Sequence, residues 1–176
     1  RGGGHSSGRL TAPLVFVGAI CKQLLKEKGI EICSHISSIK NVRDYKFEDA
    51  IPKSLVEQLQ HSMFPLIDEG CTNAMSQVIQ DAAQDGDSVG GTIECAILGV
   101  PAGVGEPFFD SIESEIAQLA FSVPAVKGIE FGKGFDITRE FGSDANDEFT
   151  IDRSGQIVTM SNNNGGILGG ISTGMP

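Results

Sequence analysis

The spacing of apolar residues along the first part of the chain predicts a helix followed by a strand. Residues 11–28 carry apolar side chains at helical intervals, with Thr11 as a candidate N-cap and Gly29 as a candidate C-terminal stop. Residues 30–38 then alternate between apolar and polar, which is typical of a strand with one buried face. A helix–turn–strand unit is therefore expected at this end.

The middle of the chain predicts a longer connection and two further elements. Residues 39–65 are polar and interrupted by prolines, so we expect a connecting segment with one short helix near 55–61. Residues 73–85 have a helical pattern. Residues 86–99 are typical of a loop that leads into a strongly apolar strand.

The next segment repeats this order of elements. Asp110 is a candidate N-cap, and Glu113 three residues later completes the pattern of a capping box. The helix that follows is expected to end near Ser122, and residues 126–131 have the composition of a strand.

A short sequence repeat suggests an internal duplication. Lys28–Ile32 reads KGIEI and recurs as KGIEF at Lys127–Phe131, in each case after a predicted helix. A duplicated helix–turn–strand unit would give an α+β fold with pseudo-twofold layers. Chance similarity of a five-residue motif is the alternative explanation.

Composition limits the class of protein. A chain of 176 residues suits one domain, so residues 1–176 are predicted to form a single domain. The net charge of −10 disfavours nucleic acid and anionic membranes as partners, and the absence of Trp disfavours base stacking. No stretch approaches twenty consecutive apolar residues, so no membrane-spanning segment is expected.

The cysteines and histidines give no metal-site pattern. Four cysteines occur without CxxC spacing, and Cys21 and Cys95 lie within apolar runs, so we expect buried thiols in a reducing cytoplasm. The histidines lie far apart and have no neighbouring cysteine, so the sequence predicts no zinc site and no other metal site.

The glycine-rich segment near the start has the chemistry of an anion site. Arg1, His5 and Arg9 surround two serines and three consecutive glycines just before the first predicted helix. Bare backbone N–H groups, the helix dipole, guanidinium groups and the hydroxyls of Ser6 and Ser7 all favour a phosphate or carboxylate. The segment lacks the GxxxxGK[ST] pattern of a P-loop, and an exposed turn with incidental charge is the alternative.

Acidic residues occur in three predicted loops, at Asp87, at Asp144–Glu148 and at Glu106. Asp87 follows Gly86 and is expected in a turn that stops a helix, whereas Asp144–Glu148 lacks the spacing of an EF-hand and is interpreted as a solvated hairpin. Glu106, between a glycine and a proline, fits either a site residue or a carboxylate that stabilises a loop.

The last segment, Ser161–Pro176, contains five glycines among a few anchoring apolar residues. Ile167, Leu168 and Ile171 are expected to hold it in the core, while the glycines leave backbone open to a large planar or anionic ligand. Both ends of the chain fall within glycine-rich loops, so we expect the chain to be an internal piece of a longer protein.

Taken together, these glycine motifs resemble those of one family. The segments that carry the resemblance are RGGGHSSGRLTA, DGDSVGG, GVPAGVGEPFFD, AVKGIEFGKGF and SNNNGGILGGISTG, in this order. They resemble chorismate synthase over essentially the whole chain, and they are too long and specific for a chance match.

The resemblance implies an activity and an architecture. The family converts 5-enolpyruvylshikimate 3-phosphate to chorismate by a trans-1,4-elimination of phosphate that requires reduced FMN. It implies a β-α-β sandwich with helices layered between antiparallel sheets, and a homotetramer in the cytoplasm.

The resemblance also implies roles for particular residues. The positions implied to contact FMN are His5, Ser6, Ser7, Pro124, Ala125, Asn163, Asn164 and Gly169. Ser7 and Arg9 match positions that also reach the substrate. The family often has arginine where this chain has His5, which removes an ionic contact at that position.

The catalytic histidines of the family lie outside this chain. They occur in Gly-Glu-Ser-His-Gly and Arg-Pro-Gly-His motifs, and neither motif is present in the sequence. His35 and His61 occur in unrelated contexts and are expected at the surface. We therefore expect the chain by itself to have no measurable activity, and a folded flavin- or phosphate-binding module without catalysis is the alternative function.

Overall fold

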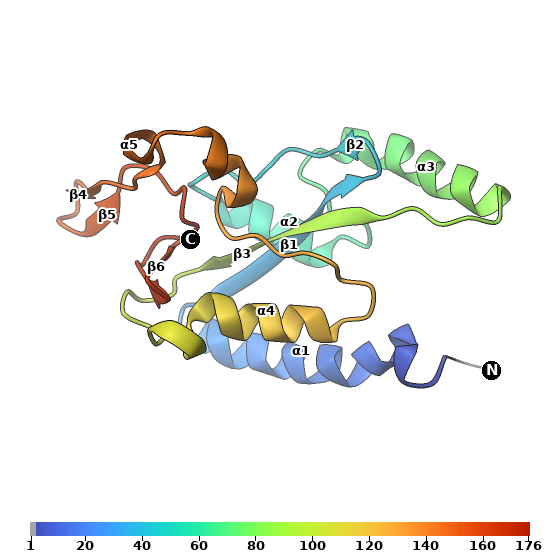
Figure 1. Cartoon of the computed structure of the whole chain (residues 1–176), viewed down its shortest axis with the longest axis horizontal. Coiled ribbons are helices and arrows are strands. Elements are labelled where there is room, and N and C mark those ends of the chain that lie inside the picture. The colour runs from blue at the N-terminus through green and yellow to red at the C-terminus, as the bar shows by residue number, and fades with distance from the viewer. Residues whose placement is uncertain (1–2) are drawn as a thin grey trace. The chain divides into compact units, whose positions relative to one another are not determined.

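The structure is a computed structural model that describes residues 3–176. The chain divides into two compact units. The first unit contains the residues up to Glu31 together with Leu98–Pro176, and the second unit contains Ile32–Ile97. Figure 1 shows the elements of both units, which are described separately below.

The second unit is built on a three-stranded sheet with the order β2-β1-β3. Its strands are β1 (Glu31–Ile39), β2 (Val42–Arg43) and β3 (Gly91–Leu98), and β1 and β2 pair antiparallel. Its helices are α2 (Lys53–His61), η3 (Glu69–Cys71) and α3 (Thr72–Gln84). The predicted strands and helices of this part of the chain are thus confirmed within one or two residues, whereas β2 was not predicted.

The core of the second unit is small and apolar. Ile39, Leu66 and Met75 are buried against one another, and partly buried apolar side chains from the sheet and α3 pack around them. Helix α2 adds Val56 and Leu59, which lie three residues apart on its buried face. Burial of such side chains stabilises a fold by about 1.5–3 kcal/mol each.

The first unit carries two long helices and two short hairpins. Its helices are η1 (Gly4–Ser6), η2 (Gly8–Leu10), α1 (Thr11–Glu27), η4 (Phe108–Asp110), α4 (Ile112–Ser122), η5 (Gly134–Arg139) and α5 (Gly142–Ala145). Its strands are β4 (Phe149–Ile151), β5 (Ile157–Thr159), β6 (Ile167–Leu168) and β7 (Ile171–Ser172). Strands β4 and β5 pair antiparallel, and so do β6 and β7.

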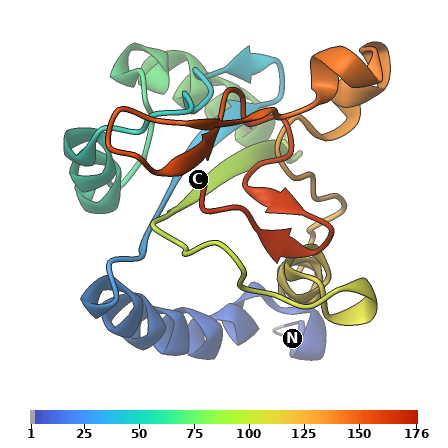
Figure 2. The same ribbon diagram turned by 90° about the vertical axis from the view of Figure 1, so that its left-hand side faces the viewer.

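Helix α1 confirms the first predicted helix but buries none of its residues. Thr11 is its first residue rather than its N-cap, and the Thr11 hydroxyl donates to the Gly8 carbonyl. Gly29 has a φ of 80°, which fits the predicted stop. Both α1 and α4 lie on the same side of the first unit (Figures 1 and 2) and expose large apolar side chains such as Phe16 and Leu119.

The segment Gly8–Glu27 is long and apolar enough to cross a membrane when only length and composition are considered. Length and composition alone do not identify a membrane span, because helices of soluble proteins and signal sequences share these properties.

Two further local predictions in the first unit are wrong. Ser111, not Asp110, caps α4: the Ser111 hydroxyl accepts from the Ser114 N–H at 3.1 Å, so the capping box with Glu113 does not form. Residues 126–131 form no strand. The second copy of the short repeat therefore has the helix but lacks the strand.

Another wrong prediction concerns cysteine burial in both units. Cys21 on α1 is exposed, and so is Cys95 in the second unit. The apolar runs that contain them predict burial, and the exposure of both side chains contradicts that prediction. Cys33 is the buried one among the four.

Candidate functional site

The first glycine loop ends in the N-terminal end of a 17-residue helix. Ser7 has an extended backbone, and its side chain accepts from the Arg9 N–H at 3.4 Å as the cap of η2. The side chains of His5, Ser6 and Arg9 are exposed. The loop therefore presents hydroxyls and a guanidinium group near the positive end of α1, as an anion site requires. Arg1 lies outside the described residues.

The closing segment forms a tight hairpin. Leu168 pairs with Ile171, and the two residues between them, Gly169 and Gly170, have φ values of 62° and 86°. Positive φ at both central positions is what a type I′ turn requires, and its twist matches that of the flanking strands. A Cβ at Gly169 would meet no atom within 4 Å, so the tip of the hairpin has open space beside it.

Asp147 holds the base of this hairpin. It is 6% exposed, which corrects the solvated interpretation at this position, whereas Asp144 and Glu148 are exposed as expected. Its Oδ1 accepts from the Ser161 hydroxyl and the Asn163 N–H, both at 2.7 Å. Its Oδ2 accepts from the N–H and the side-chain amide of Asn164, both at 2.8 Å.

The same contacts set the charge state of Asp147. Burial raises the pKa of the carboxyl, but the hydrogen bonds from Ser161, Asn164 and Asn163 favour the carboxylate and outweigh that effect. The net pKa is lowered from its ordinary value. Asp147 is therefore a carboxylate at neutral pH and acts only as an acceptor.

Gly132 allows the chain to pass directly beneath the asparagine loop. Its φ is 56°, and a Cβ there would collide with the Asn163 carbonyl oxygen and lie 2.5 Å from the Gly165 nitrogen. The neighbouring Lys133 N–H donates to that Asn163 oxygen at 2.7 Å. Gly132 of the motif at 125–135 and Gly165 of the closing motif therefore approach each other too closely for either to carry a side chain.

Ser172 joins the hairpin to the glycine–proline loop. The Ser172 hydroxyl donates to the Pro101 carbonyl at 2.6 Å and accepts from the Val104 N–H at 2.9 Å. The Ser172 N–H donates back to the Val104 carbonyl at 2.8 Å. No sequence pattern marks Ser172 beyond its place in a glycine motif, because its partners are about seventy residues earlier in the chain.

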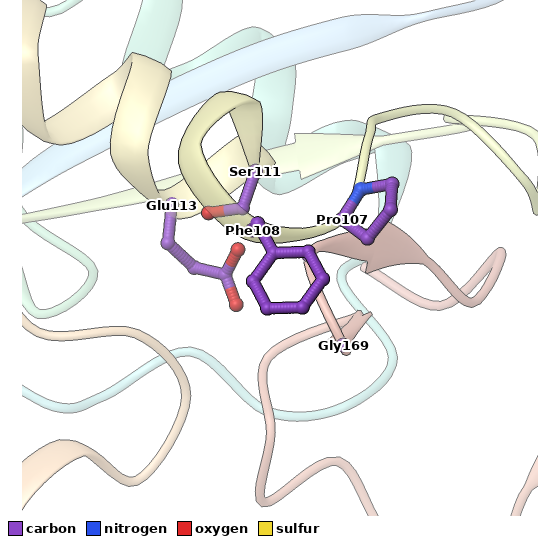
Figure 3. Close-up of a pocket in the computed structure, with 6 residues that line it drawn as sticks. Pro107, Phe108, Ser111, Glu113 and Gly169 are labelled. Carbon is purple, nitrogen blue, oxygen red and sulfur yellow. The ribbon is translucent and has the colours of Figure 1, made fainter.

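A shallow pocket of about 390 Å³ lies at the tip of the hairpin (Figure 3). It is lined by Pro107, Phe108, Ser111, Glu113, Gly169 and Gly170. The Phe108 side chain is 87% exposed on a backbone with a φ of 64°, which is strained for a bulky residue. Within the described part of the chain, the buried Oε2 of Glu113 has no hydrogen-bond partner. Sequence reasoning singled out Gly169 here and missed Phe108.

The predicted site residues fall into three groups in the first unit. Asn163, Asn164 and Gly169 lie together on the closing segment, whereas His5–Arg9 lie at the start of α1, apart from β6 in Figure 1. Ala125 follows α4 and is exposed with a φ of 71°, a conformation that non-glycine residues rarely adopt.

The asparagine side chains already have partners within the chain. The Asn163 amide donates to the Ala145 carbonyl at 3.2 Å, and the Asn164 amide donates to Asp147. These side chains therefore stabilise the loop. Other atoms of the loop would contact a ligand, or these side chains would do so after the loop rearranges.

His35, in the second unit, is not the surface residue that the sequence suggested. Its side chain is 0% exposed, with Nδ1 2.9 Å from Asp44 and Nε2 2.8 Å from Glu94. The signal that could have revealed it is the alternation of β1, because His35 shares a strand face with the buried Cys33. His61 is exposed, as expected.

Comparison with known proteins agrees with the motifs. The family model described as chorismate synthase matches residues 1–176. The chain is 45% identical over 178 residues to a chorismate synthase of Dehalococcoides mccartyi, covering 100% of this chain and 47% of that protein. It is 44% identical over 177 residues to one of Thermococcus gammatolerans, covering 100% of this chain and 48% of that protein.

A solved structure gives the same result for the fold. A structure titled "Crystal Structure of Chorismate Synthase" matches with a TM-score of 0.87 and 35% identity, covering 97% of this chain and 54% of the other. The mixed α+β class with small antiparallel sheets is thereby confirmed.

The chain therefore belongs to a family of biosynthetic lyases whose members use reduced FMN. That family is chorismate synthase. The chain spans about half the length of the curated relatives it matches.

Proposed function

We propose that this chain supplies the flavin-contacting part of a chorismate synthase. The reaction is the FMN-dependent trans-1,4-elimination of phosphate from 5-enolpyruvylshikimate 3-phosphate, which gives chorismate. The observation that carries the proposal is the family match along the whole chain, together with a glycine hairpin whose tip is open at Gly169.

The residues present fit a flavin nucleotide and a phosphorylated substrate. Open space beside Gly169, and beside Gly4 and Gly8 in the first loop, would let a flat ring or a phosphate approach the backbone closely. The exposed Arg9 and Ser6 offer the donors that a phosphate needs. When bound, the reduced flavin supplies electron density to the substrate as phosphate leaves.

The roles of this chain's own residues are binding and orientation. Ser7 and Arg9 would hold an anionic group of the substrate at the start of α1. His5 and Ser6 would contact the flavin, together with Pro124, Ala125 and the closing loop with Asn163, Asn164 and Gly169. Preorganised donors of this kind lower a barrier by fixing reacting groups before the reaction begins.

The proposal extends to the assembly of the protein. It includes a single-domain β-α-β sandwich with helices layered between antiparallel sheets, pseudo-twofold symmetry, a homotetramer and a cytoplasmic location. The exposed apolar side chains of α1, such as Val15 and Phe16, support a layered arrangement, because such a face is normally covered.

Titration with FMN under reducing, anaerobic conditions tests the proposed function, with 5-enolpyruvylshikimate 3-phosphate present and absent. Binding that the substrate strengthens would support a shared pocket. Arg9→Ala should weaken that substrate effect, and Lys22→Ala, an exposed cation on α1, serves as the matched control. Absence of flavin binding to the chain and to a full-length relative under the same conditions would contradict the proposal.

A turnover assay separates catalysis from binding. The second candidate function is a folded flavin- or phosphate-binding module without catalysis. The observation that favours it is that both ring nitrogens of His35 are hydrogen-bonded to carboxylates, those of Asp44 and Glu94. His35 has no ring nitrogen left to act as a general acid on a substrate. Chorismate formation by the chain alone would contradict the expectation that it is inactive by itself.

A further inference from the structure

We propose that Asp147 is a positioning residue that fixes the closing glycine loop in the conformation that receives the flavin. The inference rests on the proposed function for the identity of the ligand. Its structural basis, the fixing of the loop by the carboxylate, stands independently of that function.

The carboxylate binds two consecutive peptide N–H groups. One oxygen accepts from Asn163 at 2.7 Å and the other accepts from Asn164 at 2.8 Å. Two bonds from adjacent peptides to one rigid carboxylate leave little freedom of rotation about the bonds between them. The hydroxyl of Ser161 and the side-chain amide of Asn164 occupy the remaining acceptor positions.

Asn163 and Asn164, which Asp147 holds, come a few residues before the open hairpin tip at Gly169. Strand β6 begins three residues after Asn164 and is only two residues long, so it has little stability of its own. The orientation of the hairpin tip at Gly169 therefore depends on the contacts that hold the two ends of the hairpin. Asp147 and Asn162, whose side chain accepts from the Gly166 N–H at 2.8 Å, hold the end at β6, whereas Ser172 holds the end at β7.

The loop depends on the negative charge of Asp147 and not only on the shape of its side chain. The four donors on Asp147 are neutral and all point at its two oxygens. Replacement by asparagine keeps the shape but turns one oxygen into an NH₂ group that faces N–H donors. A buried donor then meets a donor, and the loop must rearrange to relieve the contact.

The test compares Asp147→Asn with two controls. Asp144→Asn removes an exposed carboxylate three residues away, whose side chain makes no hydrogen bond among the described contacts. Val56→Ala destabilises the second unit without touching the loop, because Val56 is buried on α2. Asp147→Glu keeps the negative charge and tests whether a carboxylate at this position restores the order of the loop and the affinity for FMN.

Two measurements are made on each protein. Amide hydrogen exchange reports the order of the loop through Asn163 and Asn164, and fluorescence titration with reduced FMN gives the dissociation constant. We expect Asp147→Asn to speed exchange at these amides and to weaken FMN roughly tenfold or more, with partial recovery in Asp147→Glu. Both controls should leave exchange in the loop and FMN affinity close to the starting protein.

The outcomes separate the two proposals. Unchanged exchange at Asn163 and Asn164 in Asp147→Asn would overturn the positioning role, whatever the affinity. Faster exchange with unchanged FMN affinity would also overturn it, because the fixed loop would then not serve the flavin. Equal weakening in Val56→Ala would reduce the effect to general stability and overturn it too. If the starting protein binds no FMN, the proposed function fails for this chain, and exchange alone decides whether Asp147 fixes the loop.

Discussion

His35 and Glu94 lie 59 positions apart in the sequence, yet Nε2 of the first is 2.8 Å from Oε2 of the second. The other ring nitrogen, Nδ1, is 2.9 Å from Oδ2 of Asp44. A carboxylate can only accept, so an imidazole between two carboxylates must donate from both nitrogens and carry a positive charge. The second unit therefore encloses an ion triad centred on His35, with the ring of Phe47 packed edge-on against it at 4.8 Å between centroids.

The charge on His35 predicts a pH-dependent stability. Burial lowers its pKa, but the hydrogen bonds and negative charges of Glu94 and Asp44 outweigh burial, so the net pKa is raised. The stabilisation is therefore fully present below the unfolded-state pKa and is lost as the pH rises through the folded-state pKa. Urea unfolding across this pH range should show stability falling toward alkaline pH.

A substitution isolates this effect. His35→Gln should destabilise by about 3–5 kcal/mol at neutral pH, because it leaves two carboxylates facing a neutral side chain, and by less at alkaline pH. His61→Gln is the matched control, since His61 is exposed and should change stability by less than about 0.5 kcal/mol. A loss of stability in His35→Gln that does not vary with pH would contradict a charged imidazole.

Asp44 should respond to pH in the opposite direction. Burial raises the pKa of this carboxyl, but the N–H groups of Asp68, Ile67 and Tyr45 and the ring of His35 outweigh burial, so the net pKa is lowered. Its stabilisation is present above the unfolded-state pKa and is lost as the pH falls through the folded-state pKa.

Asp44→Asn should therefore destabilise by about 3 kcal/mol near neutral pH and much less in acid, because it breaks a buried ion pair. Asp49→Asn, an exposed carboxylate in the same connecting segment, is the control. Denaturant titrations at neutral and acidic pH check the prediction, and equal losses at both would count against it.

Gly132 should not tolerate a side chain. Gly132→Ala would place a methyl group against the Asn163 carbonyl at a φ of 56°, so we expect a loss of about 2 kcal/mol or more from strain and displacement of the loop. Gly128→Ala is the control, because a Cβ there meets nothing within 4 Å. Thermal melting compares the two, and equal melting temperatures would show that the loop does not need the close approach.

The cap of α4 gives a prediction that separates structure from sequence pattern. Ser111→Ala should destabilise by about 1 kcal/mol, because it leaves the Ser114 N–H without its side-chain acceptor. Asp110→Ala, at the position that the sequence pattern favoured, should change stability by less than about 0.5 kcal/mol. If chemical denaturation showed a larger loss of stability for Asp110→Ala than for Ser111→Ala, the result would contradict the Ser111 cap and support the capping box that starts at Asp110.

The long helices could be predicted because their signals are local. α1, α2, α3 and α4 follow the apolar spacing of the chain to within a few residues. Strands β1 and β3 were predicted for the same reason. Strand β2 was missed, because two residues are too few to show a period, and 126–131 has a strand's composition without a strand neighbour.

The sequence by itself determined the family, through glycine motifs whose order and length are specific, and it determined which segments are helical, through side-chain spacing. Only the tertiary structure decided the roles of His35 and Asp147. Each is a polar residue in an unremarkable local context, and each is buried because donors or acceptors from distant segments meet it there. A buried charge depends on partners that folding brings together, and no local pattern of residues records them.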